Sequence, residues 1–253
     1  MAEEPLVTMQ TANGVATIRL NRPGKRNALS TELLATLREI LRGIAEDFPA
    51  TRAVVLLGEG PSFCAGADIK EFERWDAASL FEFIELGSEV FRTIHELPQP
   101  VIAGIQGHAL GGGLELALAC DLRLANQTAT FGLPEINIGG VPGWGGTVRL
   151  QEVIGRGMAT YMTLTGEFID AITARSLGLV HEVVGDDLAG HCAALAARLA
   201  DKIPTTLRLA KRALNSGSPY DVSAQAGIEQ YSNLACMLTD ERRDSVESFV
   251  GRV

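Results

Sequence analysis

Short apolar runs alternate with amphipathic stretches over the first 125 residues, and this alternation restricts the chain to an α/β fold. Strand candidates are continuous or alternating apolar segments, whereas helix candidates carry apolar residues three and four positions apart. The sequence predicts strands at 15–20, 54–57, 101–105 and 122–125, and helices at 30–47, 77–97 and from the glycine cluster to 120. Strands that alternate with helices predict sheets whose faces are covered by helices.

After about Met158 the pattern changes, because strand signals become sparse and amphipathic helices dominate. One further strand is expected near 180–184, and helices are expected at 188–199, 206–215 and 222–239, with Asp240 capping a last short helix. The prediction is therefore a core with the functional site in residues 1–195 and a C-terminal helical region in residues 196–253.

Charge and length limit the classes of function. The chain has 253 residues, a net charge of −9 and an isoelectric point near 5.0. A chain of this size buries enough surface to fold without disulfides or a structural metal. Its acidity opposes binding to nucleic acid or to anionic membranes, both of which require basic surface. We therefore expect neither nucleic-acid nor membrane partners.

The cysteines and histidines show no spacing typical of a metal site. The four cysteines are expected to be reduced and packed as small apolar residues; they are Cys64, Cys120, Cys192 and Cys236. The longest uncharged run, 97–114, contains prolines, a histidine and several glycines, so it is a poor membrane span. Without a signal peptide at the start, the sequence predicts a cytoplasmic protein.

Two glycine-rich turns, each with a glutamate near it, are the candidates for chemistry. Phosphate-loop, nucleophile-elbow and zinc-helix motifs are absent, and Gly111-Gly112-Gly113 does not fit the dinucleotide-binding pattern. Three glycines before a helix let its free N–H groups approach a ligand, which suits an oxyanion hole. Glu115 lies in the first turn of this apolar helix, where an ionised carboxylate is costly to bury. The alternative is that Glu115 only favours the helix N-terminus.

Glu135 stands alone between apolar residues in an uncharged stretch. It could pair with Glu115 as a general acid and base, because burial raises carboxyl pKa values toward neutrality; the alternative is a surface carboxylate on a loop. A third segment, 61–70, carries small residues after a strand and could also bring backbone N–H groups to a ligand. Alone, it could equally be an ordinary turn.

Together these segments resemble the enoyl-CoA hydratase/isomerase, or crotonase, superfamily. The motifs that carry the resemblance are 62–70 (SFCAGADIK), 107–121 (GHALGGGLELALACD), 131–135 (FGLPE) and 142–147 (PGWGGT), with supporting matches at 20–23, 27–29, 164–166 and 174–180. The resemblance extends from about Val15 to Val250. It implies a crotonase (ClpP-like) α/β spiral of repeated ββα units, with a C-terminal helical region that forms a homotrimer or a dimer of trimers.

The resemblance also implies roles for individual residues. The amides of Ala67 and Gly112 would form the oxyanion hole, Glu115 would activate water, and Glu135 would donate a proton to Cα, with Gly143 positioning the water or the acid. The implied coenzyme A contacts are Lys25, Arg26, Ala28, Ala65, Ala67, Asp68, Ile69, Lys70 and Leu110, and the implied acyl pocket contains Leu133 and Trp144. Trp144 could instead be a packed core aromatic.

Two glutamates favour hydration of a 2-enoyl-CoA thioester over other activities of the superfamily. An enoyl-CoA double-bond isomerase needs only one acid, and an acyl-CoA thioester hydrolase shares the oxyanion hole, so both remain alternatives. Coenzyme A would enter as part of the substrate, with no permanently bound cofactor and no metal. One branch of the superfamily binds RNA through a lysine-rich helix, but the helix at 30–47 has only Arg38 and Arg42 as basic residues.

Overall fold

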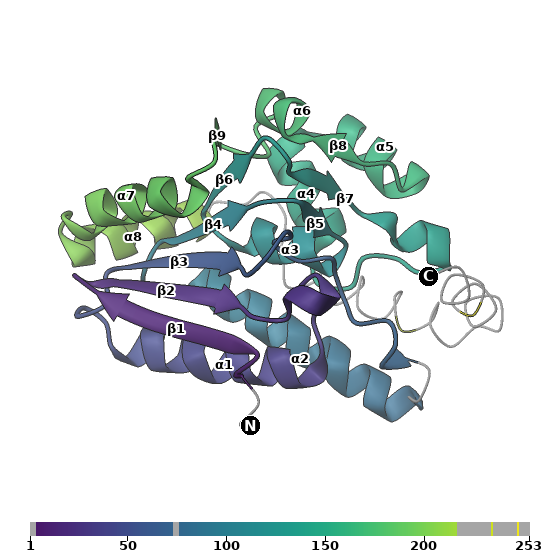
Figure 1. Ribbon diagram of the computed structural model, residues 1–253, viewed down its shortest axis with the longest axis horizontal. Helices are drawn as coiled ribbons and strands as arrows, with labels where there is room; N and C mark the ends of the chain where they lie inside the picture. The colour runs from purple at the N-terminus through teal and green to yellow at the C-terminus, as the bar shows by residue number, and fades with distance from the viewer. Residues whose placement is uncertain (1–3, 73–75, 217–233, 235–246, 248–253) are drawn as a thin grey trace.

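Two β-sheets form the centre of the protein, and helices pack around them (Figure 1). The computed structural model describes residues 4–72 and 76–216, together with residues 234 and 247. The larger sheet has the order β1 (Val7–Ala12), β2 (Val15–Leu20), β3 (Ala53–Gly58), β4 (Val101–Ile105), β6 (Leu122–Asn126) and β9 (Glu182–Val184). The smaller sheet has the order β5 (His108–Leu110), β7 (Thr130–Gly132) and β8 (Ile169–Asp170).

The larger sheet is parallel except at its first strand. Strands β1 and β2 form an antiparallel hairpin in which Ala12 pairs with Val15. Asn13 and Gly14 form its turn with positive φ angles of 51° and 76°, which the Asn-Gly signal predicts. The sequence analysis did not find β1, because most of its side chains are exposed and its apolar alternation is limited to Val7 and Met9.

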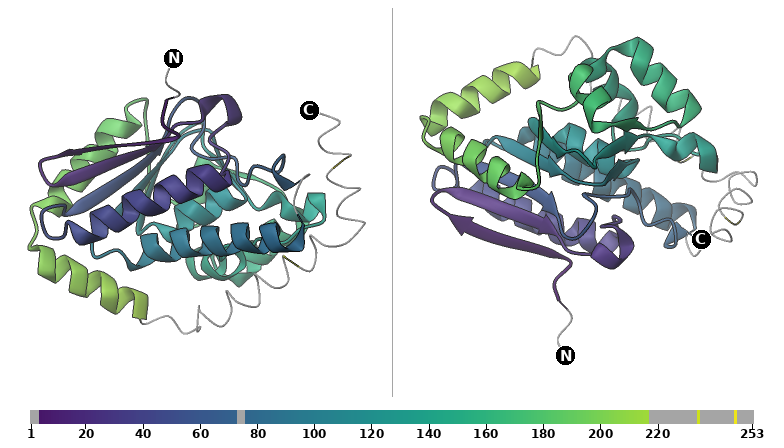
Figure 2. Two further views of the ribbon diagram at one scale, coloured as in Figure 1. Left: turned by 90° about the horizontal axis from the view of Figure 1, so that it is seen from below. Right: turned by 45° about the horizontal axis from the view of Figure 1, so that its top comes forward.

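Strand β3 is buried on both faces, as its continuous apolar sequence predicts. Val54 and Leu56 face the main core, whereas Val55 and Leu57 face a second apolar cluster. Helices α1 (Thr31–Glu46) and α2 (Ala77–Glu96) supply the main core and lie side by side in Figure 2. Helix α7 (Leu188–Ala200) supplies the second cluster, so the sheet lies between two helical layers.

The predicted helices and strands of the core are confirmed, including Ser30 as the N-terminal cap of α1. The Ser30 side chain accepts a hydrogen bond from the Leu33 amide at 3.2 Å, which starts the helix. The other α-helices in the described part of the chain are α3 (Gly112–Ala119), α4 (Gly146–Ile154), α5 (Arg156–Thr165), α6 (Ala171–Ser176) and α8 (Pro204–Ser216). The predicted helix at 222–239 and its neighbour at Asp240 lie outside the described residues.

The same order of two strands followed by a helix occurs twice in succession along the chain. Strand β4 in the larger sheet is followed by β5 in the smaller sheet and then by α3, and the order β6, β7, α4 repeats this pattern. Each repeat therefore crosses from one sheet to the other before its helix. This is the ββα repetition that the resemblance implies.

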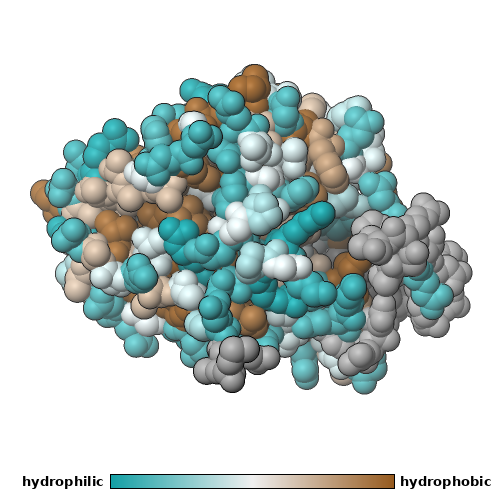
Figure 3. Space-filling model, viewed as in Figure 1, coloured by the Kyte–Doolittle hydropathy of each residue, from teal (hydrophilic) through white to brown (hydrophobic). Residues whose placement is uncertain are grey.

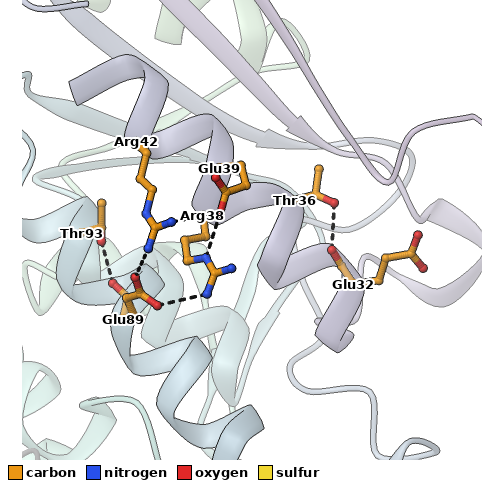
Figure 4. A network of polar contacts seen from close by, with 7 residues as sticks. All are labelled: Glu32, Thr36, Arg38, Glu39, Arg42, Glu89 and Thr93. Carbon is orange, nitrogen blue, oxygen red and sulfur yellow. Dashed lines mark hydrogen bonds and ion pairs between the residues drawn. The ribbon is translucent and has the colours of Figure 1, made fainter. Parts of the chain in front are cut away.

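The outer surface carries ion pairs between helices and also exposed apolar residues. Arg38 and Arg42 of α1 both bind the Glu89 carboxylate of α2, at 3.3 and 2.7 Å, which ties the two helices together (Figure 4). Figure 3 shows apolar residues gathered where α7 and α8 lie, on the left of that view. No helix in the described part of the chain is long and apolar enough to cross a membrane.

A buried lysine, Lys211, is one of the contacts that attach helix α8 to the core. The Lys211 ammonium lies 2.7 Å from the Asp121 carboxylate and also donates to the carbonyl oxygens of Ile94 and Gln99. Burial raises the pKa of Asp121 even with this lysine beside it. The predicted domain boundary at residue 195 falls inside α7, and elements that pack on the core continue through α8.

We expect Lys211→Met to lower the free energy of unfolding by about 3 kcal/mol, because it leaves the partly buried Asp121 carboxylate without the ammonium that binds it. Denaturant unfolding at fixed protein concentration measures the change. Lys202→Met, at an exposed position just before α8, is the matched control and should change stability by less than about 0.5 kcal/mol. Equal effects of the two substitutions would contradict a structural role for the buried pair.

Candidate active site

A β-bridge between Leu29 and Ala67 fixes the first predicted oxyanion donor. The Leu29 N–H donates to the Gly66 carbonyl at 2.8 Å, and the Asp68 N–H donates to the Leu29 carbonyl at 2.9 Å. Successive amides of an extended strand point in opposite directions. The N–H of Ala67 therefore points away from Leu29 and is not used in this bridge.

The second predicted donor, the Gly112 amide, is the first residue of α3. The first N–H groups of an α-helix have no acceptor within the helix. Gly111, with φ of +53°, turns the chain from β5 into this helix, a conformation that favours glycine. A Cβ atom on Gly66 would lie 3.5 Å from the Gly112 nitrogen, so the two predicted donors are on neighbouring segments.

Glu115 is buried, with 1% of its surface exposed, and its charge is compensated by backbone amides. Its Oε1 accepts hydrogen bonds from the N–H groups of Trp144, at 2.7 Å, and Gly146, at 2.9 Å. Gly146 is the first residue of α4, so the carboxylate lies at the positive end of that helix. Hydrogen bonds of this kind favour the charged carboxylate. The start of α4 therefore stabilises the Glu115 carboxylate, in addition to the place of Glu115 in the first turn of α3.

Glu135 is the second residue of a short 3₁₀ helix, Pro134–Ile138, that follows β7. Its carboxylate lies over the turn before α3, because a Cβ atom on Gly111 would be 3.0 Å from Oε1 of Glu135. The residue is partly buried and its Oε2 atom is shielded from solvent. Glu135 is therefore not a freely exposed loop carboxylate.

One cavity contains both glutamates and both predicted oxyanion donors. It encloses about 680 Å³ including its open mouth. Eight predicted site residues line it: Ala65, Ala67, Ile69, Gly112, Glu115, Glu135, Gly143 and Trp144. The other lining residues, which the sequence analysis did not assign to a site, are Gly66, Phe72, Phe83, Ile84, Gly111, Pro134, Ile138, Gly140 and Val141.

The other predicted contacts do not line this cavity. Leu133 is fully buried in the main core and is not among the residues that line the cavity, so its contact with the acyl group stays a prediction. Three predicted coenzyme A contacts have exposed side chains: Lys25, Arg26 and Lys70. Lys25 and Arg26 come shortly before Leu29, the residue that forms the β-bridge with Ala67. The remaining predicted contacts outside the cavity lining are Ala28, Asp68 and Leu110.

Asp68 was expected to contact coenzyme A, but its carboxylate binds a neighbouring arginine. The Arg22 guanidinium donates to Oδ2 of Asp68 at 2.8 Å and to the Ala28 carbonyl at 2.7 Å. Asn27, which is fully buried, accepts from the Arg22 amide at 2.8 Å and donates to the Ser62 carbonyl at 2.7 Å. This network, which we call the Arg22 clamp, holds the segment that carries Ala67.

His108 lies at the start of β5 and connects to the same segment. Its Nδ1 is 2.9 Å from the Ser62 hydroxyl. Burial, together with the positive charge of Arg26, lowers the pKa of His108. A neutral imidazole accepts the serine proton at this nitrogen when the other nitrogen carries the hydrogen. This interaction ties β5 to the segment before Ala67 through side chains.

Three of the four cysteines are described, and all three are buried and free. Burial raises the pKa of Cys64, Cys120 and Cys192 to about 12 in each case, so these thiols stay protonated near neutral pH. Cys236 lies outside the described residues. Within the described ranges, no group of three or more His, Cys, Asp or Glu side chains is arranged to hold a metal ion.

Comparison with known proteins identifies the family. The family model described as enoyl-CoA hydratase/isomerase matches residues 10–253. The chain belongs to the enoyl-CoA hydratase/isomerase family. The short-chain-enoyl-CoA hydratase of Clostridium acetobutylicum is 36% identical, over 96% of this chain and 94% of the relative. The crotonyl-CoA hydratase of Syntrophomonas wolfei is also 36% identical, over 99% of this chain and 96% of the relative.

A solved structure from the same family agrees with the fold. The crystal structure of an enoyl-CoA hydratase from Bacillus anthracis has a TM-score of 0.82 and 37% sequence identity, and the match covers 98% of this chain and 96% of that one. The resemblance to the crotonase superfamily and the expected crotonase fold are therefore confirmed.

If the Arg22 clamp positions the Ala67 amide, Asp68→Asn should lower kcat for an enoyl-CoA thioester about tenfold, with KM changed less than twofold. Losing an oxyanion donor outright costs about 2.7–4 kcal/mol, and a displaced donor should cost part of that. Glu59→Gln is the control, because it removes an exposed ion pair with Arg19. A rise in KM at constant kcat would indicate instead that Asp68 serves only substrate binding.

Proposed function

We propose that the protein is an enoyl-CoA hydratase, which adds water reversibly to a 2-enoyl-CoA thioester and produces a 3-hydroxyacyl-CoA. The observation that carries this proposal is that Glu115 and Glu135 line the same cavity as Ala67 and Gly112. The site thus offers two carboxylates and two backbone donors to one small substrate. The relatives named as hydratases support the same activity.

In this mechanism the thioester carbonyl oxygen accepts hydrogen bonds from the amides of Ala67 and Gly112. Negative charge develops on this oxygen when a nucleophile adds to the conjugated double bond. Donors that are already oriented stabilise that charge without reorganising. The fixed strand at Ala67 and the helix start at Gly112 support such an arrangement.

The two glutamates divide the proton transfers. The Glu115 carboxylate takes a proton from water while the water oxygen bonds to Cβ, and the π electrons move into an enolate. Glu135 gives a proton to Cα, and the carbonyl double bond is restored. A proton passed back from Glu115 to Glu135 would complete the cycle, so that water is added with no net change in the protein.

Backbone amides around Glu115 support its assignment as the base. The N–H groups of Trp144 and Gly146 donate to its Oε1 atom and hold the carboxylate at the wall of the cavity that it lines. Gly143 lines the cavity beside these residues, which is consistent with a place next to the water or the acid.

Coenzyme A would bind at the mouth of the cavity as part of the substrate, with no permanently bound cofactor. The exposed Lys25 and Arg26 support phosphate binding there, because cations attract phosphate oxygens. Ala28, Lys70 and Leu110 would add contacts on the same side, while Ala65 and Ile69 line the cavity itself.

Assembly and location remain predictions. A homotrimer or a dimer of trimers would use the region 196–253, and the protein would act in the cytoplasm without nucleic-acid or membrane partners. Fatty acid β-oxidation is the pathway that we propose for an enzyme acting on such acyl-CoA substrates.

The test is the loss of conjugated enoyl-thioester absorbance when the purified protein meets crotonyl-CoA. We expect hydration by the native protein and a loss of about 10²-fold or more in Glu115→Gln and in Glu135→Gln, because each removes a proton-transfer group. Glu32→Gln, at an exposed position on α1, is the matched control and should retain native activity.

Retention of more than a tenth of native activity in either variant would contradict the role assigned to that glutamate. A folded native protein that binds coenzyme A and hydrates no enoyl-CoA would contradict the hydratase proposal. Isomerase and thioester hydrolase substrates would then be tested next, because both reactions use the same oxyanion donors.

A further inference from the structure

The indole of Trp144 forms part of the cavity wall, yet only 7% of the residue is exposed. Phe83 and Phe91 of α2 pack edge-on against it, with ring centroids 5.2 Å away in both cases. The indole N–H donates to the Ile84 carbonyl at 3.1 Å. Because buried indole N–H groups need an acceptor, this bond and the two rings hold the indole in one orientation.

Two glycines make room for this ring. A Cβ atom on Gly87, in the middle of α2, would collide with the indole of Trp144. A Cβ atom on Gly112 would lie 2.5 Å from Cζ3 of the same ring, closer than side-chain carbons approach. Glycine is unfavourable inside a helix, so the contact explains why α2 has one at this position. Both neighbouring helices are therefore fitted to the indole.

Trp144 lines the cavity together with Phe72, Phe83 and Ile84. Its indole also fills the space beside Gly87 of α2 and Gly112 of α3. A smaller side chain at this position would leave a void that joins the cavity. Because Gly112 is also the proposed carbonyl donor, the ring lies close to the first acyl carbons beyond the thioester.

We propose that Trp144 is a specificity-determining residue that limits the site to short-chain enoyl groups; this inference rests on the proposed hydratase function. A pocket excludes longer acyl chains by shape only when the side chains of its wall cannot move aside. The indole meets that condition, since two aromatic rings, one hydrogen bond and two glycine contacts hold it.

The ring can be tested without disturbing the base. The hydrogen bond from Trp144 to Glu115 comes from the backbone N–H, which every residue except proline retains. Trp144→Leu therefore removes the ring and keeps this donor. Trp144→Phe keeps one aromatic ring at the same place and is the matched control for the loss of volume.

The experiment measures kcat/KM for straight trans-2-enoyl-CoA substrates of four, six, eight and ten carbons. For the native protein we expect kcat/KM to fall at least about tenfold from four to ten carbons. Trp144→Leu should raise the ten-carbon to four-carbon ratio about tenfold or more, mainly through a lower KM for the long substrate. Trp144→Phe should shift this ratio less than Trp144→Leu does.

Two results would overturn the inference: native kcat/KM that does not fall with chain length, or a Leu variant whose ratio stays at the native value. Circular dichroism checks that the variants are folded. If Trp144→Leu does not fold, the Trp144→Phe variant decides: a ten-carbon to four-carbon ratio of kcat/KM equal to the native one would also overturn the inference. Absence of hydration at every chain length by the native protein would instead contradict the proposed function, so the two failures are distinguishable.

Discussion

The pair of amide hydrogen bonds to Oε1 of Glu115 is the interaction on which the rest of the site depends. A buried carboxylate without such partners would be too costly to keep charged. The amides of Trp144 and Gly146 provide this compensation and, in doing so, tie α3 to the start of α4. The same bonds fix the loop before α4, which places the indole of Trp144 on the cavity wall.

Most of the precise geometry comes from the backbone. The oxyanion donors proposed above belong to Ala67 and Gly112, and both positions depend on close contacts between chain segments. A Cβ atom on Gly113 would collide with the Cys64 carbonyl, so α3 can approach the neighbouring strand segment only with glycine there. The Arg22 clamp also holds the segment that contains Ala67, through the bond from Arg22 to Asp68.

Local signals in the sequence predicted most of the fold. Helix α1 has a capping serine and periodic leucines, and β3 is continuously apolar, so each could be recognised from its own residues. Glu115 and the glycine cluster stood out for the same reason. Strand β1 carries only a short apolar alternation and gains its place by pairing with β2, which its own residues do not reveal.

Contacts between distant residues explain what the sequence analysis missed. Arg22 and Asp68 are 46 positions apart, and nothing in either local segment indicates that they pair. The donors to Glu115 are backbone amides about 30 positions further along the chain, and a backbone amide has no residue type by which to recognise it. The glycine-rich loop at 143–146 was a usable clue, by the reasoning applied to 111–113.

The bridge between Leu29 and Ala67 also has an evolutionary consequence. Since the donor at Ala67 is a main-chain group, many side chains could occupy that position without removing it. Adding or deleting one residue between β3 and the bridge would affect the donor, because successive amides of an extended segment alternate in direction. Such a change would turn the donor toward the opposite side, so the length of this segment should be under stricter selection than its composition.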